Sequence, residues 1–62
     1  MLLSYLETYA LRHFAGDRWT DATAVKGMRN VLAYLERKSM LVRLPNGSYA
    51  ITQTGREALK SQ

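Results

Sequence analysis

The chain has 62 residues, 47% of them hydrophobic, and nine Lys and Arg against five Asp and Glu give a formal net charge of +4. This length allows one domain, and the ordinary hydrophobic content argues against disorder. Because the chain has no cysteine, disulfides and thiolate metal sites are excluded, and no apolar run approaches the roughly 18 residues of a membrane span.

The basic balance favours a polyanionic partner such as nucleic acid, although solubility alone can require a net charge of this size. Glu7 interrupts the first apolar run, and no basic segment precedes that run. We therefore expect no signal peptide, no membrane partner and a cytoplasmic location.

The first predicted element is a helix over residues 2–14. Its apolar residues recur at spacings of three and four and so share one helical face. They are Leu3, Leu6, Ala10 and Phe14. Gly16 and Asp17 are typical of a helix end. We expect this face to pack on the rest of the domain.

A second apolar stripe lies beside the first, about 100° round the same helix. It consists of Leu2, Tyr5 and Tyr9, and Leu11 lies on a further flank. A helix that is apolar over so wide an arc is either deeply buried or shared with a partner, and tyrosine is enriched at interfaces. We therefore expect a homodimer through this helix. The alternative is that the tyrosines only cover the rim of the core.

Residues 21–39 carry a continuous helical pattern, with Thr20 as the candidate N-cap. The apolar positions are Ala24, Val25, Met28, Val31, Leu32 and Leu35. Gly27 interrupts the pattern at a cost of about 1 kcal/mol relative to alanine. The segment is therefore either a single long helix or two helices that meet near Gly27. We expect Trp19 in the core, because so small a domain needs its large side chains.

A β-hairpin is predicted over residues 41–51. Residues 41–44 and 48–51 are β-prone, and Asn46-Gly47 between them favours the positive φ of a tight turn. Thr52 is then expected to cap a last helix over residues 53–60.

Three segments in the second half of the chain occur in an informative order. They are Leu-Glu-Arg-Lys-Ser-Met-Leu-Val at 35–42, Leu-Pro-Asn-Gly-Ser-Tyr-Ala-Ile-Thr at 44–52 and Thr-Gln-Thr-Gly-Arg-Glu-Ala-Leu at 52–59. In this order they resemble the recognition-helix exit, the wing and the closing helix of the winged helix-turn-helix family. Ser39 stands where the family usually has glycine, and the helix before the recognition helix is either shortened or fused to it. The resemblance implies a mainly α winged-helix domain with a small antiparallel β-hairpin.

The resemblance also implies which residues contact duplex DNA. The recognition helix would run from about Lys26 to Arg37, with its exposed side formed by Lys26, Arg29, Asn30, Ala33 and Arg37. Arginine and asparagine bond the edges of guanine and adenine, although any exposed helix carries such residues. The wing would place Arg43, Asn46 and Ser48 on phosphates; the alternative is a purely structural hairpin.

We therefore expect a small sequence-reading DNA-binding protein, a transcriptional regulator. The alternative is a winged-helix module for protein interaction or dimerisation that binds no DNA, since Arg43 is the only charged residue of the wing. The acidic residues have no catalytic spacing and there is no Gly-rich phosphate loop. His13 has no second metal ligand beside it, so we assign it a packing role. We expect no enzyme activity, metal, cofactor or small-molecule ligand.

Overall fold

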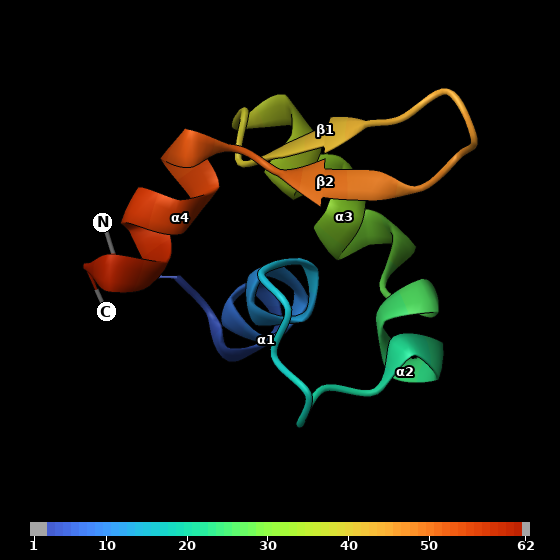
Figure 1. Cartoon of the computed structure of the whole chain (residues 1–62), viewed down its shortest axis with the longest axis horizontal. Helices are drawn as coiled ribbons and strands as arrows, with labels where there is room; N and C mark the ends of the chain where they lie inside the picture. Colours follow the sequence, from blue (N-terminus) through green and yellow to red (C-terminus); the bar gives the residue numbers. More distant parts are fainter. Residues whose placement is uncertain (1–2, 62) are drawn as a thin grey trace.

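The computed structural model describes residues 3–61, and this part of the chain forms four helices and an antiparallel two-stranded hairpin (Figure 1). In chain order the elements are α1 (Tyr5–Phe14), α2 (Ala22–Lys26), α3 (Arg29–Arg37), β1 (Leu41–Arg43), β2 (Tyr49–Ile51) and α4 (Gln53–Lys60). The expected mainly α fold with a small antiparallel hairpin is confirmed.

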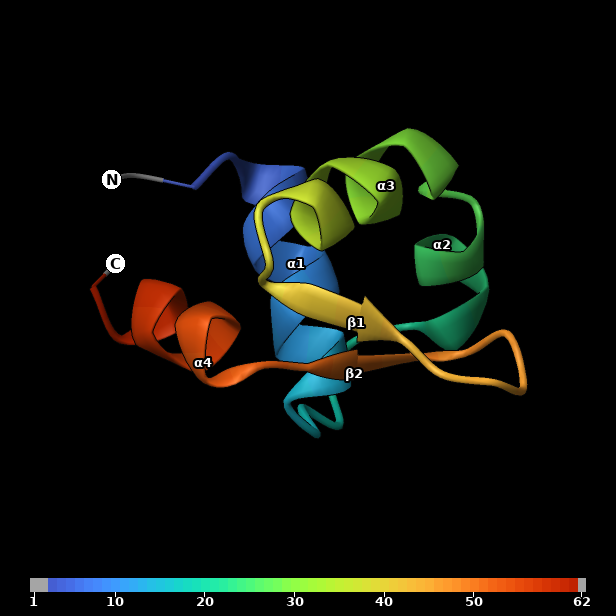
Figure 2. The same ribbon diagram turned by 90° about the horizontal axis from the view of Figure 1, so that it is seen from above.

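Helix α1 is the central element, and the others form an arc around it from α2 through α3 and the hairpin to α4 (Figure 1). It contacts α2, α3, α4 and β2. The tip of the hairpin and α2 lie at the end of the molecule opposite α4 (Figures 1 and 2). The buried core between these elements is almost entirely aliphatic: Leu3, Ala10, Leu11, Val25, Leu32, Leu35, Met40 and Leu41.

Helix α1 begins at Tyr5, later than predicted, because Ser4 is its N-cap. The Ser4 hydroxyl accepts the N–H of Glu7 at 3.2 Å, and the Glu7 carboxylate accepts the N–H of Ser4 at 2.9 Å. This reciprocal capping box satisfies two N–H groups at the helix start. The prediction that the helix includes Leu3 is therefore wrong, and Leu2 lies outside the described residues.

The buried face of α1 is rotated from the predicted one. Ala10 and Leu11 are completely buried and Phe14 packs against the core, whereas Leu6 is 47% exposed. Placing Leu6 in the core was therefore wrong, as was placing Leu11 on a flank. The cause is tertiary, because α2, α3, α4 and β2 all pack against α1 and together bury the side of the helix that carries Ala10 and Leu11.

Residues 21–39 form two helices. The carboxylate of Asp21 caps α2 by accepting the N–H of Thr23 at 2.9 Å. Helix α2 ends at Lys26, and Met28, with φ −96° and ψ 47°, separates it from α3. Lys26 therefore belongs to α2, and the recognition helix predicted from about Lys26 begins only at Arg29.

Thr20 is not the N-cap that the sequence predicted, because its hydroxyl has other partners. It donates to the carbonyl of Asp17 at 2.7 Å and lies 3.0 Å from Nδ1 of His13. These contacts tie the loop between α1 and α2 to the end of α1.

The prediction that Trp19 lies in the core is wrong, since this side chain is 90% exposed. Its backbone N–H donates to Oδ1 of Asp17 at 2.9 Å, and Oδ2 of Asp17 forms an ion pair with Arg12 at 2.7 Å. Asp17 thus fixes the loop on the outer side of α1, and aliphatic residues fill the core instead.

The hairpin follows its sequence signal. Leu41 pairs with Ile51, Val42 with Ala50 and Arg43 with Tyr49. In the turn, Gly47 has φ +87°, its N–H donates to the carbonyl of Leu44 at 3.0 Å, and Oδ1 of Asn46 accepts the N–H of Ser48 at 3.0 Å. The predicted Asn46-Gly47 turn is confirmed.

Helix α4 has the predicted bounds and cap, with the Thr52 hydroxyl accepting the N–H of Gly55 at 3.1 Å. Gly55 is buried where α4 meets the end of the α3–β1 connection. A Cβ at this position would overlap the carbonyl oxygen of Met40 and lie 2.8 Å from Cγ1 of Ile51. The absence of a side chain therefore lets α4 approach the hairpin base.

The first prediction uses this close approach. Gly55→Ala should lower the free energy of unfolding by about 1–3 kcal/mol, because the added methyl group forces the backbone apart. Gly27→Ala is the matched control: Gly27 has right-handed φ, and its Cβ would meet nothing closer than 3.5 Å, so stability should rise by about 0.4–1 kcal/mol. Urea unfolding measures both, and equal effects of the two substitutions would contradict the packing described.

The second prediction concerns Asp17. The Trp19 N–H, together with the hydrogen bond and charge of Arg12, lowers the pKa of Asp17 from its ordinary value of 3.8. A carboxyl whose pKa is lowered on folding stabilises the protein above its unfolded pKa, and this contribution is lost as the pH falls through the folded value.

Thermal unfolding between pH 7 and pH 2 should therefore show that the wild-type protein loses part of its stability in the acid range. In Asp17→Asn this acid-dependent loss should be smaller, because the variant has no carboxyl group at this position to protonate. Arg12→Ala should reduce it without abolishing it, because the Trp19 N–H remains. If Asp17→Asn loses as much stability as the wild type when the pH falls, the Asp17 contacts do not stabilise the loop.

Candidate functional site

An open groove of about 560 Å³ lies between the hairpin, α2 and the N-terminal half of α3. The end of α1 closes it on the inner side. Its apolar floor includes Phe14, Leu32 and Ala33, and its polar lining residues are His13, Lys26, Arg29, Arg43, Ser48 and Tyr49. We call this the basic groove.

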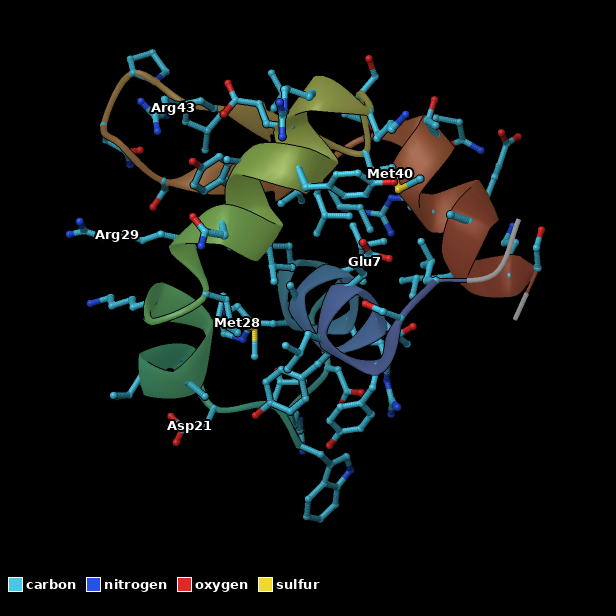
Figure 3. The ribbon with its side chains drawn as sticks, turned by 180° about the vertical axis from the view of Figure 1, so that it is seen from behind. Glu7, Asp21, Met28, Arg29, Met40 and Arg43 are labelled. Carbon is cyan, nitrogen blue, oxygen red and sulfur yellow. The ribbon has the colours of Figure 1, made fainter. Side chains whose placement is uncertain are left out.

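Positive charge converges on the basic groove from three elements. Lys26 is the last residue of α2, Arg29 the first of α3 and Arg43 the last of β1. All three are exposed, and no carboxylate is among the described residues that line the groove. Arg29 and Arg43 extend from the same side of the molecule (Figure 3). Such a surface attracts an extended anion.

Arg43 is held by its cross-strand neighbour. Its Nη2 donates to the hydroxyl of Tyr49 at 3.0 Å, and its guanidinium lies 5.5 Å from the centre of the Tyr49 ring. The hydrogen bond and charge interaction with Tyr49, and then the charge of Glu36 on α3, raise the pKa of Arg43. The hydrogen bond and the ring contact with Tyr49 therefore hold this guanidinium at the groove wall.

The N-terminus of α3 opens beside Arg29. Its N-cap residue, Met28, makes no side-chain capping bond, so the first N–H groups of the helix face solvent or a ligand. A helix N-terminus carries a partial positive charge. It adds to the charge of Lys26 and Arg29 on either side of the turn.

The structure brings five of the eight predicted DNA-binding residues to the basic groove. They are Lys26, Arg29, Ala33, Arg43 and Ser48. Asn30 is exposed on α3 outside the lining, and Arg37 lines a separate hollow with Tyr34 and Lys38. Asn46 is exposed at the hairpin tip, where its Oδ1 is already bonded to the N–H of Ser48.

Two polar side chains of the lining, those of His13 and Tyr49, were missed by the sequence analysis. His13 was assigned a packing role, and Tyr49 was taken only as a strand residue. Nδ1 of His13 lies 3.0 Å from the Thr20 hydroxyl, which itself donates to the carbonyl of Asp17. His13 and Tyr49 reach the groove because α1 lies close to the hairpin, and the sequence does not indicate that proximity. In the structure the ring centres of Phe14 and Tyr49 are 6.0 Å apart.

The residues predicted at a dimer interface have different environments. Tyr5 is 78% exposed, whereas Tyr9 is half-buried and its hydroxyl accepts the N–H of Asp21 at 2.6 Å. Leu2 lies outside the described residues. Tyr5 is thus available to a partner, and Tyr9 mainly supports the loop between α1 and α2.

Within residues 3–61, His, Asp and Glu side chains form no group of three that could hold a metal ion. No helix of this part of the chain is both long and apolar enough to cross a membrane. Comparisons of the sequence with protein-family models and curated proteins, and of the fold with solved structures, found no match.

Proposed function

We propose that this protein is a winged-helix domain that binds duplex DNA, with α3 as the recognition helix and the β1–β2 hairpin as the wing. The observation that carries the proposal is the convergence of Lys26, Arg29 and Arg43 on one groove whose described lining includes no carboxylate. Each cation comes from a different element, so the fold itself assembles the basic surface.

The order of elements supports the winged-helix assignment. Helices α2 and α3 are separated only by Gly27 and Met28, and the hairpin and α4 follow directly. Ser39 has φ 64°, the left-handed backbone that favours glycine, and it stands where the family has glycine. Of the two alternatives left open by the sequence, a shortened helix or one fused to the recognition helix, the five-residue α2 corresponds to the shortened helix.

Helix α3 has the dimensions and side chains for a major groove. An α-helix with its side chains is about 10–12 Å across, which matches the major-groove width of about 12 Å, and the nine residues of α3 form about two and a half turns. Arg29, Asn30, Ala33 and Arg37 are exposed along it. In our proposal Arg29 and Asn30 bond base edges near the helix N-terminus, Ala33 contacts a thymine methyl group, and Arg43 and Ser48 contact phosphates.

The third prediction tests this surface with random duplex DNA. On random DNA Arg29 has no cognate base, so we expect it to contact a phosphate, as Lys26 and Arg43 do. Anisotropy titrations over a series of salt concentrations should then give micromolar or weaker binding with a log–log slope near −3, at about −0.9 for each phosphate neutralised. Arg43→Ala should weaken binding on all sequences and make the slope shallower by about 1. On a selected site, Arg29→Ala should cost about 1–3 kcal/mol if Arg29 reads a base.

Arg56→Ala is the matched control, because it removes the same charge from α4, at the end of the molecule away from the groove. It should leave the salt slope nearly unchanged. Equal losses for Arg56→Ala and Arg43→Ala would mean that binding follows total charge, and the basic groove would not be the site.

The second candidate function is a protein-interaction module that binds no DNA. The exposed Trp19 and Tyr5 favour it, as does Glu36, whose negative charge acts on Arg43 at the edge of the groove. The same titration distinguishes the two functions. A folded protein with no detectable affinity for duplex DNA at low salt would support the interaction module.

A further inference from the structure

A second surface lies on the outward side of α1. Tyr5, Tyr9 and Trp19 line a shallow hollow of about 260 Å³, with Arg12 and Asp17 at its rim. The two tyrosine rings are 6.3 Å apart and tilted by 43°. We call this the aromatic surface. None of the residues that line it also lines the basic groove.

The aromatic surface is held in place by contacts of its own. The Tyr9 hydroxyl accepts the N–H of Asp21 at 2.6 Å, and Asp17 accepts both the Trp19 N–H at 2.9 Å and Nε of Arg12 at 2.8 Å. The backbone that carries Trp19 is thus ordered in the free protein. Docking on a preformed surface loses less conformational entropy than docking on a loose loop.

The exposed apolar area is large for a chain with 4484 Å² of total surface. A Trp or Tyr side chain buries about 150–250 Å², so the exposed Trp19 and Tyr5 together leave roughly 300–400 Å² in water. A standard interface buries about 800 Å² on each partner. These two side chains therefore supply nearly half of one face of such an interface, which fits a dimer of modest affinity.

The distribution of charge along the chain favours a second copy of this chain as the partner of the aromatic surface. Residues 3–21 contain two Arg against three Asp and Glu, a formal charge of −1, whereas residues 22–61 contain seven Lys and Arg against two Glu, a formal charge of +5. A polyanion therefore has little attraction to the aromatic surface. Two copies of a basic chain meet there with the least repulsion.

The charged pair at the rim of this surface is already satisfied within the chain. Oδ2 of Asp17 forms the ion pair with Arg12 at 2.7 Å, and Oδ1 of Asp17 accepts the Trp19 N–H. Docking over the rings therefore covers a paired carboxylate, which avoids the cost of burying an isolated charge.

We infer that a second copy of this chain docks on the aromatic surface, burying Trp19 and Tyr5 against their counterparts. The dimer does not depend on nucleic-acid binding, because the two surfaces use different residues. It leaves both basic grooves open.

The test combines sedimentation equilibrium with the fluorescence of the only tryptophan, both without DNA. Between about 5 and 500 μM the average mass should rise from one chain toward two, and the Trp19 emission should move to shorter wavelength as its ring leaves water. Tyr5→Ser with Trp19→Ser should lower the association constant at least about tenfold. Val42→Ser, which replaces a 47% exposed apolar residue on β1, is the control and should change it less than about twofold.

Circular dichroism should give the same folded spectrum for all three proteins. A monomeric mass at every concentration would overturn the inference. So would association that persists in the double variant, or that Val42→Ser abolishes equally. Loss of DNA binding with intact association, or the reverse, separates this inference from the proposed function.

Discussion

At the base of the hairpin, the connection from α3 to β1 and the connection from β2 to α4 lie side by side and are hydrogen-bonded to each other. The carbonyl of Met40 accepts the N–H of Thr52 at 3.0 Å, and the Thr52 hydroxyl donates to the carbonyl of Ser39. Gly55 then packs against the Met40 carbonyl so closely that no side chain fits between them. The left-handed Ser39 reverses the chain here, and the N–H of Met40 closes the turn on the carbonyl of Leu35 at 2.9 Å. This junction sets the position of the hairpin relative to α3.

The basic groove is a consequence of that junction and of the break after α2. Arg43 stands at the groove wall because the register pairs it with Tyr49, and the register begins at Leu41 directly after the junction. Lys26 and Arg29 enter from the opposite wall because Gly27 and Met28 turn the chain between the two helices. A shift of the hairpin would therefore separate Arg43 from Arg29 without altering either side chain.

Sequence reasoning succeeded where the signal was local. Asn46-Gly47 determines its own turn, and Thr52 caps α4 through a hydrogen bond three residues away. It failed where tertiary contacts decide between local alternatives. Periodicity on α1 gave two overlapping apolar stripes, and only the elements packed around the helix select Leu11 over Leu6. Trp19 was misplaced for a related reason, since size favours burial but Asp17 binds its backbone outside the core. His13 lines the groove because the tertiary fold places the end of α1 there, and no local sequence pattern indicates this.

The exposed position of Trp19 on the aromatic surface bears on both stability and DNA binding. A chain of this length buries only about 60% of the surface that its unfolded form exposes, so its core is thin. Here the largest apolar side chain contributes nothing to that core. Covering it in a dimer adds apolar burial without requiring a larger domain, and association that occurs only in the folded state stabilises that state by mass action.

Because the aromatic surface and the basic groove share no lining residue, one dimer would present two grooves to a single DNA molecule. In our proposal a groove whose described lining holds three cations binds DNA weakly by itself, and linking two such grooves would raise the effective concentration of the second once the first is bound. The proposed dimer would therefore both strengthen DNA binding and remove Trp19 from water.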